Sequence, residues 1–270
     1  MPEIPLLKLT GLTKRFGGLV AVKSIDLDVP DRQVTSVIGP NGSGKTTFFN
    51  LISGMYVPTS GAVLLRQADG SQVDLVGKKP FEINRLGVAR TFQNLRLFPQ
   101  MTVLENVMVG MHSRTQEGLF SALLRSRKFQ EEEARIREKA GELLQFFGDL
   151  LYPARFEEAR NLSYANQRRL EIVRALATEP RLLLLDEPAA GMNPTEKKGL
   201  MEDIRRLRDA GYTLLLIEHD MTLVRHISDH VVAFDHGEKI AEGSFDLVRS
   251  QPQVIEAYLG KGAAGAAAHA

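Results

Sequence analysis

The sequence predicts an α/β protein with a mostly parallel sheet, joined to a strand-rich region and a helical region. Residues 166–260 alternate short apolar strands with helices, and this pattern requires crossover connections between parallel strands. Residues 5–93 are rich in β-branched residues between turn signals, whereas residues 94–165 have helical periodicity. We therefore expect three segments, 1–93, 94–165 and 166–260, and a mobile glycine and alanine tail over 261–270.

The composition excludes several classes of protein. With 43% hydrophobic and 25% charged residues among 270, the chain is globular, not disordered or fibrous. Its 34 basic and 33 acidic residues leave a net charge of +1, which gives no electrostatic reason to expect a nucleic acid partner. The absence of cysteine excludes disulfides and thiolate metal sites. Because no apolar run approaches the roughly 18 residues of a membrane span and no signal pattern is present, we expect a cytoplasmic chain.

Turn residues divide the strand-rich segment. Gly17-Gly18 and Pro30-Asp31 separate three apolar and β-branched runs, and these runs predict strands over 6–12, 24–29 and 34–38. A helix is expected over 45–53, because Gly54 is placed to stop it. Two further β-rich runs predict strands over 62–66 and 73–76.

The rest of the chain predicts helices and buried strands. Thr102 and Glu105 form a capping-box pattern at a helix start, and apolar residues from Phe129 to Phe147 recur at helical spacing. Between them, residues 113–127 predict a loop or short helices. A helix ending at Thr178 is followed by strands 182–185, 213–217 and 231–234 and helices 194–210 and 221–228. The fully apolar strands fit a sheet covered on both faces.

A phosphate-binding loop is the strongest functional signal. The segment from Gly39 to Thr46 fits the pattern G-x-x-x-x-G-K-[ST] and lies between an apolar strand and a helix, the context that this pattern needs. Glycines let backbone N–H groups turn toward phosphate oxygens, Lys45 supplies a positive charge and Thr46 offers a hydroxyl to Mg²⁺. The predicted cofactor-binding residues are Gly39, Pro40, Asn41, Gly42, Ser43, Gly44, Lys45, Thr46 and Thr47.

Four more side chains are expected beside this loop. Asp186 and Glu187 end a buried strand and so emerge at the carboxyl edge of the sheet, where α/β proteins bind ligands. Asp186 can hold Mg²⁺, and Glu187 can orient or deprotonate a water molecule. His219 closes another strand at that edge, where it can contact the terminal phosphate. Gln93 can touch both a metal and a water molecule.

The order of these motifs resembles the ATP-binding subunits of ABC transporters. The resemblance covers about residues 6–260 and includes a signature segment, Leu162-Ser163-Tyr164-Ala165-Asn166-Gln167. It implies an ATPase with a P-loop NTPase core of mostly parallel sheet, an antiparallel β subdomain and a helical subdomain. It also implies that Phe16 stacks on adenine and that Ser163 and Ala165 reach the nucleotide of an opposite subunit. The implied catalytic residues are Gln93, Glu187 and His219, and the implied metal site contains Thr46, Gln93 and Asp186.

Five further segments, 90–94, 170–176, 189–194, 218–221 and 256–260, resemble the ATPase of high-affinity branched-chain amino-acid importers. This resemblance implies ATP and Mg²⁺ as cofactors, a second ATPase subunit, two membrane permeases and, indirectly, a periplasmic solute-binding protein. The chain would then lie on the inner face of the plasma membrane, with residues 94–105 against a permease. An ATPase of a lipid or polysaccharide exporter, or a non-transport ABC ATPase, is the alternative, because direction and cargo reside in the permeases.

The signature departs from the pattern of the closer relatives at two positions. Ala165 stands in place of a glycine and Asn166 in place of a glutamine. If φ were positive at Ala165, the extra methyl group would cost on the order of 1 kcal/mol. We therefore hypothesise an asymmetric heterodimer in which the pocket completed by Ala165 closes less tightly.

Overall fold

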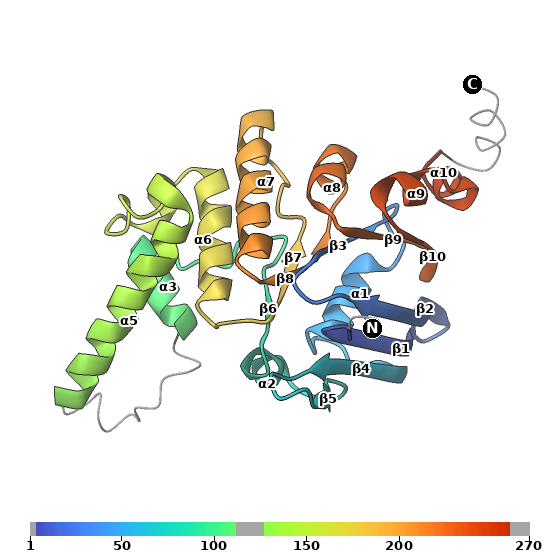
Figure 1. The fold of residues 1–270 in the computed structure, drawn as a ribbon, viewed down its shortest axis with the longest axis horizontal. Coiled ribbons are helices and arrows are strands. Elements are labelled where there is room, and N and C mark those ends of the chain that lie inside the picture. The colour runs from blue at the N-terminus through green and yellow to red at the C-terminus, as the bar shows by residue number, and fades with distance from the viewer. Residues whose placement is uncertain (1–3, 112–126, 260–270) are drawn as a thin grey trace.

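The computed structural model describes residues 4–111 and 127–259, which form two β-sheets with a group of helices at one end (Figure 1). The loop predicted over 113–127, apart from its last residue, lies outside the described residues, as does the tail predicted over 261–270. Along the described part of the chain, no helix combines the length and the apolar character needed to cross a bilayer.

The larger sheet has six strands in the order β10-β9-β3-β8-β7-β6. Five of them are parallel, and β10 pairs antiparallel with β9 at the edge. The strands are β3 (Val34–Ile38), β6 (Val88–Arg90), β7 (Leu182–Asp186), β8 (Thr213–Ile217), β9 (His230–Asp235) and β10 (Glu238–Gly243). Strand β7 lies between β6 and β8, so the residues that follow these three strands meet at one edge of the sheet.

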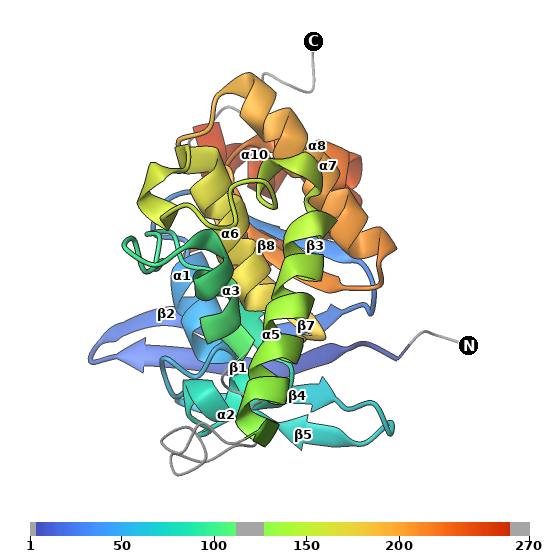
Figure 2. The ribbon, with the colours of Figure 1, turned by 90° about the vertical axis from the view of Figure 1, so that its left-hand side faces the viewer.

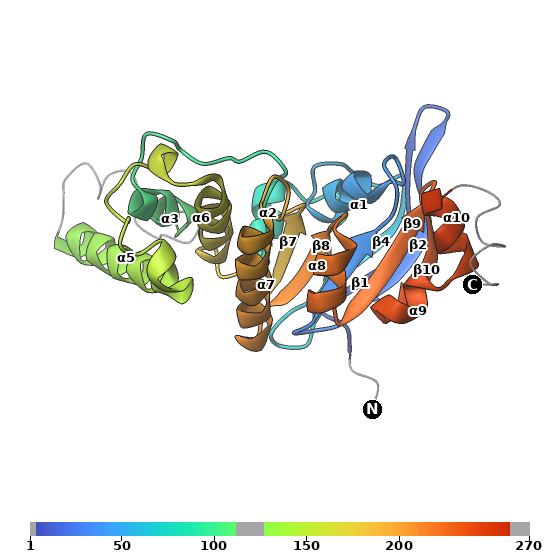
Figure 3. The ribbon, with the colours of Figure 1, turned by 90° about the horizontal axis from the view of Figure 1, so that it is seen from above.

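Both faces of this sheet are buried, as its apolar strands predicted. Because side chains alternate along a strand, Leu182 and Leu184 face one layer while Leu183 and Leu185 face the other. The first layer contains α1 (Lys45–Ile52) and the smaller sheet. The second contains α6 (Tyr164–Leu176), α7 (Pro194–Asp209) and α8 (Met221–Ile227). Figure 3 shows α1 on one side of the sheet and α7 and α8 on the other.

The smaller sheet is antiparallel, with the order β2-β1-β4-β5. Its strands are β1 (Leu7–Phe16), β2 (Leu19–Val29), β4 (Ser60–Arg66) and β5 (Gln72–Asp74). The Gly17-Gly18 turn joins β1 to β2, as predicted. Strand β2 starts five residues earlier than the predicted 24–29. Its first four residues, Leu19 to Val22, form an apolar run that was not predicted as part of the strand, and only Val22 among them is buried.

The helical segment contains α3 (Val103–Met111), α5 (Arg127–Phe146) and the start of α6, and Figure 2 shows α5 running past α3. Short 3₁₀ turns span Gly148–Leu150 and Ala159–Asn161. The capping box before α3 is confirmed, since Glu105 N–H donates to Thr102 Oγ1 at 3.1 Å and Thr102 N–H donates to Glu105 Oε2 at 2.8 Å.

The helices predicted after the signature are confirmed to within two residues, but several short elements were not predicted. These are α2 (Pro80–Arg85), α9 (Phe245–Arg249), α10 (Pro252–Leu259) and the strands β6 and β10. Each has eight residues or fewer, so its hydrophobic period is too short to detect.

Candidate functional site

Three glycines shape the loop between β3 and α1. Gly39, Gly42 and Gly44 have φ angles of 147°, 81° and 102°, which side chains of L residues rarely permit. A Cβ on Gly39 would lie 2.2 Å from the carbonyl oxygen of Phe234, and one on Gly44 would lie 2.5 Å from that of Ala21. Backbone atoms cannot move aside as a flexible side chain can, so this loop conformation requires glycine at both positions.

The ammonium group of Lys45 lies inside this loop. Lys45 is only 5% exposed, and its Nζ donates to the carbonyl oxygens of Gly39 and Pro40, both at 2.8 Å. Burial lowers the pKa of Lys45, while the nearby carboxylates of Glu187 and Asp186 act to raise it. A buried cation whose hydrogen bonds go only to neutral oxygens is well placed to bind an anion.

The loop borders a cavity of about 510 Å³, within the range of roughly 300–1,000 Å³ typical of small-molecule sites. It is lined by Gly18, Leu19, Val20, Ala21, Lys23, Asn41, Gly42, Ser43, Gly44, Lys45, Thr46, Thr47, Glu187, His219, His236 and Gly237. The lining from β2 and from the turn at His236 was not predicted from the sequence. Only the tertiary structure shows that these two segments lie beside the phosphate loop.

Glu187 contacts both of the other predicted catalytic residues. Gln93 Nε2 donates to Glu187 Oε2 at 2.9 Å, and His219 Nε2 lies 2.8 Å from Glu187 Oε1. Glu187 has a φ of 48°, a conformation that is rare outside glycine and often found at functional sites. Its N–H donates to the carbonyl oxygen of Ile217 at 3.0 Å, so a contact with β8 holds the strained backbone in place.

Asp186 does not line the cavity. It is buried, and its Oδ2 accepts a hydrogen bond of 2.8 Å from Arg90 Nη2. Arg90 also donates to Asn50 Oδ1 at 2.7 Å and to Ser53 Oγ at 2.9 Å, both on or next to α1. Arg90 therefore ties the predicted metal ligand to the helix that follows the phosphate loop. Arg90 was not predicted as a site residue, because no residue near it in the sequence indicates its partner.

Phe16, the predicted adenine-stacking residue, ends strand β1 and is 42% exposed. Its ring packs edge-on against Tyr56, with centroids 5.3 Å apart, and the Lys14 ammonium lies 5.0 Å from its centroid. Phe16 does not line the cavity itself, but the turn that follows it contributes Gly18. The exposed part of the ring is therefore available to a planar group beside the cavity.

The signature residues lie at the start of α6 and do not line this chain's own cavity. Ser163 is the N-cap of the helix and accepts the Asn166 N–H at 3.3 Å. Ala165 is 2% exposed and packs in the apolar core. Its φ is not positive, so the strain that we considered at this position does not arise. The reason is that the signature begins a regular helix, where alanine is favoured over glycine.

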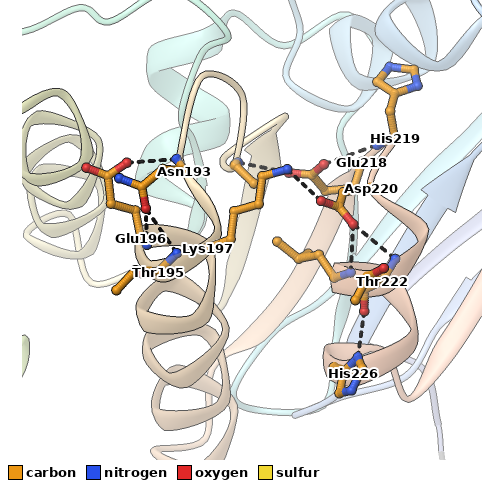
Figure 4. Close-up of polar contacts among 11 residues, drawn as sticks. Asn193, Thr195, Glu196, Lys197, Glu218, His219, Asp220, Thr222 and His226 are labelled. Carbon is orange, nitrogen blue, oxygen red and sulfur yellow. Dashed lines mark hydrogen bonds and ion pairs between the residues drawn. The ribbon is translucent and has the colours of Figure 1, made fainter.

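Buried hydrogen bonds hold the backbone around His219 (Figure 4). Glu218 is 3% exposed and accepts the N–H groups of Ala189 at 2.9 Å and His219 at 3.1 Å. Burial raises the pKa of Glu218. Asp220 caps α8 and accepts a hydrogen bond from Lys197 Nζ at 2.6 Å, which lowers the pKa of Asp220. Glu218 thus connects the loop after Glu187 with His219, a role that we did not predict.

Two protein-family models match the chain. The model described as ABC transporter matches residues 22–190, and the one described as Branched-chain amino acid ATP-binding cassette transporter matches residues 238–264. The chain is 46% identical over 258 residues to the high-affinity branched-chain amino acid transport ATP-binding protein LivG of Salmonella typhimurium, covering 95% of this chain and 98% of the relative. It is 45% identical, with the same coverage, to the protein BraF of Pseudomonas aeruginosa, which has the same description.

Solved structures agree with these matches. The ADP conformation of an ATP-binding cassette of an ABC transporter has a TM-score of 0.81 and 33% identity, covering 95% of this chain and 99% of that chain. A nucleotide-free ATP-binding cassette has a TM-score of 0.80 with the same identity and coverage. Given the phosphate loop, the group around Glu187 and these likenesses, the chain belongs to the ABC transporter family and is one of its ATP-hydrolysing, ATP-binding subunits.

Proposed function

We propose that this chain hydrolyses ATP to power an ABC importer for branched-chain or other amino acids. The observation that carries the ATPase assignment is Glu187, held between Gln93 and His219 on the cavity that the phosphate loop lines. The cargo class is supported by the descriptions of the relatives that are 46% and 45% identical and by the match over residues 238–264.

The phosphate loop supplies the nucleotide site. The glycines let the loop backbone adopt its tightly packed conformation. The Lys45 ammonium can exchange its carbonyl acceptors for phosphate oxygens, and the opposite charges make the new hydrogen bonds stronger. The exposed part of the Phe16 ring would take the base. These residues bind and orient the nucleotide before any bond changes.

Thr46, Gln93 and Asp186 offer the oxygen ligands that Mg²⁺ prefers. In residues 4–111 and 127–259, no cluster of three or more histidine or acidic side chains could hold a metal ion. The nucleotide and water would therefore supply most of the ligands, as is usual for Mg²⁺ at phosphate sites. When bound, the ion neutralises charge on the phosphates.

Glu187 is placed to act on water. Its carboxylate, oriented by Gln93 and adjacent to His219, would orient the attacking water molecule and accept its proton. His219 is 38% exposed at the side chain and lines the cavity, where it can contact the terminal phosphate. The strained backbone at Glu187 keeps the carboxylate at the rim of the cavity.

A dimer would complete the site. Ser163 is exposed at the start of α6, away from this chain's own cavity, so it is free to face the nucleotide of a second ATPase subunit, whereas Ala165, two residues on, is buried in this chain. Contacts that both subunits make only with ATP would favour the closed dimer and would be lost on hydrolysis. From the inner face of the plasma membrane, residues 94–105 would pass this change to two membrane permeases. An external solute-binding protein would deliver the cargo.

Replacing the proposed base tests the ATPase assignment. In Glu187→Gln the shape of the side chain remains but the proton acceptor is lost, so we expect ATP affinity within about threefold of wild type and turnover reduced at least about 100-fold. Calorimetric titration with Mg-ATP and a phosphate-release assay measure the two quantities. Glu242→Gln, an exposed acid on β10, is the control. Wild-type turnover by Glu187→Gln would refute the assignment.

Transport is tested in proteoliposomes that contain the chain with its co-purified permeases. We expect uptake of labelled leucine that depends on ATP inside the vesicle and on the binding protein outside. ATP-dependent movement of a lipid or polysaccharide in the opposite direction would favour the exporter alternative, and failure to co-purify with any membrane protein would favour a non-transport ATPase.

A further inference from the structure

A buried arginine on α6 holds the loop that carries Gln93. Arg168 is 3% exposed, although it belongs to a residue type that is almost always at the surface. Its Nη1 donates to the carbonyl oxygen of Phe92 at 2.7 Å, and its Nη2 donates to the carbonyl oxygen of Gln93. Two consecutive carbonyl groups next to the catalytic amide are therefore bound by one guanidinium group.

The same guanidinium binds the signature segment. Arg168 Nε and Nη2 donate to the hydroxyl oxygen of Tyr164 at 3.2 and 2.9 Å, and the guanidinium carbon lies 5.4 Å from the centroid of the Tyr164 ring. Tyr164 is the first residue of α6 and directly follows Ser163. Arg168 thus connects the start of the signature helix with the backbone of the Gln93 loop.

Glu171 supplies the countercharge. It is buried, its Oε1 accepts the Phe92 N–H at 3.4 Å, and its Oε2 lies 3.6 Å from Arg168 Nη1. The loop is therefore held through the N–H and the carbonyl group of one residue, Phe92. A buried ion pair with this many hydrogen bonds specifies a geometry more than it adds stability.

Tyr164 also touches the loop that follows Glu187. A Cβ on Gly191 would lie 3.1 Å from the Tyr164 ring, so glycine at this position lets the ring approach. One side chain of the signature segment therefore contacts, directly or through Arg168, both loops that carry the hydrolytic residues.

We propose that Arg168 and Tyr164 are positioning residues that make the placement of Gln93 depend on the placement of the signature segment. Gln93 reaches Glu187 only if its own backbone is held, and that backbone is bound by Arg168. A lysine could not replace the arginine, because one ammonium group lacks the planar fork that serves the two carbonyl oxygens and the tyrosine hydroxyl together. The inference rests on the proposed roles of Gln93 and Glu187.

The test compares Arg168→Lys and Tyr164→Phe with the control Tyr152→Phe, which removes a tyrosine hydroxyl elsewhere in the helical segment. In the nucleotide-free chain, we expect amide exchange over residues 90–97 to be at least about tenfold faster in Arg168→Lys, with exchange in α1 unchanged. We expect Arg168→Lys to lower kcat by about tenfold or more and Tyr164→Phe by a smaller factor, both with KM and Mg-ATP affinity within about twofold of wild type.

A second variant separates positioning from folding. Arg168→Met with Glu171→Leu removes both buried charges together, so it avoids the unpaired charge that either single change leaves, and we expect kcat to stay as low as in Arg168→Lys. Wild-type kcat in that double variant, or unchanged exchange over residues 90–97 in Arg168→Lys, would overturn the proposal. Failure of the proposed function itself would look different, because the wild-type chain would then bind or hydrolyse no ATP, whereas the exchange measurement requires no nucleotide.

Discussion

Gly44 shows at the scale of one residue why this position of the phosphate loop tolerates no side chain. Its φ is 102°, and a Cβ would meet the carbonyl oxygen of Ala21 at 2.5 Å. Strain and clash therefore coincide at the residue directly before Lys45. By contrast, Gly70 has a φ of 83°, and a Cβ there would have nothing within 4 Å, so strain acts alone at that position.

We expect Gly44→Ala to abolish Mg-ATP binding, because the loop must move to relieve the clash. Gly70→Ala should keep wild-type affinity and lose about 1 kcal/mol of stability, the cost of a left-handed conformation for an L residue. Calorimetric titration and chemical denaturation measure the two effects. Wild-type affinity in Gly44→Ala would show that the loop conformation is not needed for binding.

At the scale of elements, α6 and α7 are joined by a buried ion pair. Arg169 Nε donates to Asp203 Oδ2 at 2.7 Å, and Arg169 Nη1 donates to Asn166 Oδ1 at 3.1 Å. A Cβ on Gly199 would lie 2.6 Å from Arg169 Nη2, so this glycine makes room for the guanidinium. Asn166, a departure from the signature of the closer relatives, thus has a structural partner within its own chain.

Arg169→Met should lower the free energy of unfolding by about 3–5 kcal/mol, because it leaves the Asp203 carboxylate buried without its main partner. Adding Asp203→Leu should recover most of that loss. Arg66→Met, which breaks the more exposed pair with Asp31, is the control and should cost about 1 kcal/mol or less, because these two side chains are 23% and 26% exposed whereas those of Arg169 and Asp203 are 6% and 5% exposed. Urea denaturation measures all of these variants. A cost below about 1 kcal/mol for Arg169→Met alone would contradict the argument.

At the scale of the whole molecule, the nucleotide site joins distant parts of the fold. Its lining comes from β2 of the antiparallel sheet, the loop before α1, the ends of β7 and β8 and the turn after β9. A ligand that contacts all of these segments binds only the folded chain, so it must stabilise the whole molecule.

In the Glu187→Gln background, where ATP is not consumed, Mg-ATP at about 100 times its dissociation constant should add about 2.7 kcal/mol to the free energy of unfolding. This corresponds to a rise in Tm of about 5–10 °C. Differential scanning calorimetry measures the shift. Adding Lys45→Met should remove it, and an equal shift in that variant would show that the ligand binds elsewhere.

Periodicity and turn residues were sufficient to predict β3, β7, β8, α7 and α8, because each has a clear apolar pattern. They were not sufficient for β10, which is partly exposed and carries no such pattern. The first half of β2 was also missed, although Leu19 to Val22 are apolar, because only Val22 among them is buried. The cavity lining contributed by β2 and by the turn before β10 was therefore missed as well.

The sequence alone determined the local backbone chemistry of this protein. The glycine spacing before Lys45 specifies a phosphate loop, and carboxylates at the end of an apolar strand specify an edge site, because both depend on neighbours along the chain. The side-chain partners, by contrast, depend on how the chain folds in three dimensions. Arg90 and Asp186 are 96 residues apart, and Arg168 and Gln93 are 75 apart. Such pairs form because β7 lies between β6 and β8 and α6 packs beside them, and no pattern of nearby residues encodes that order.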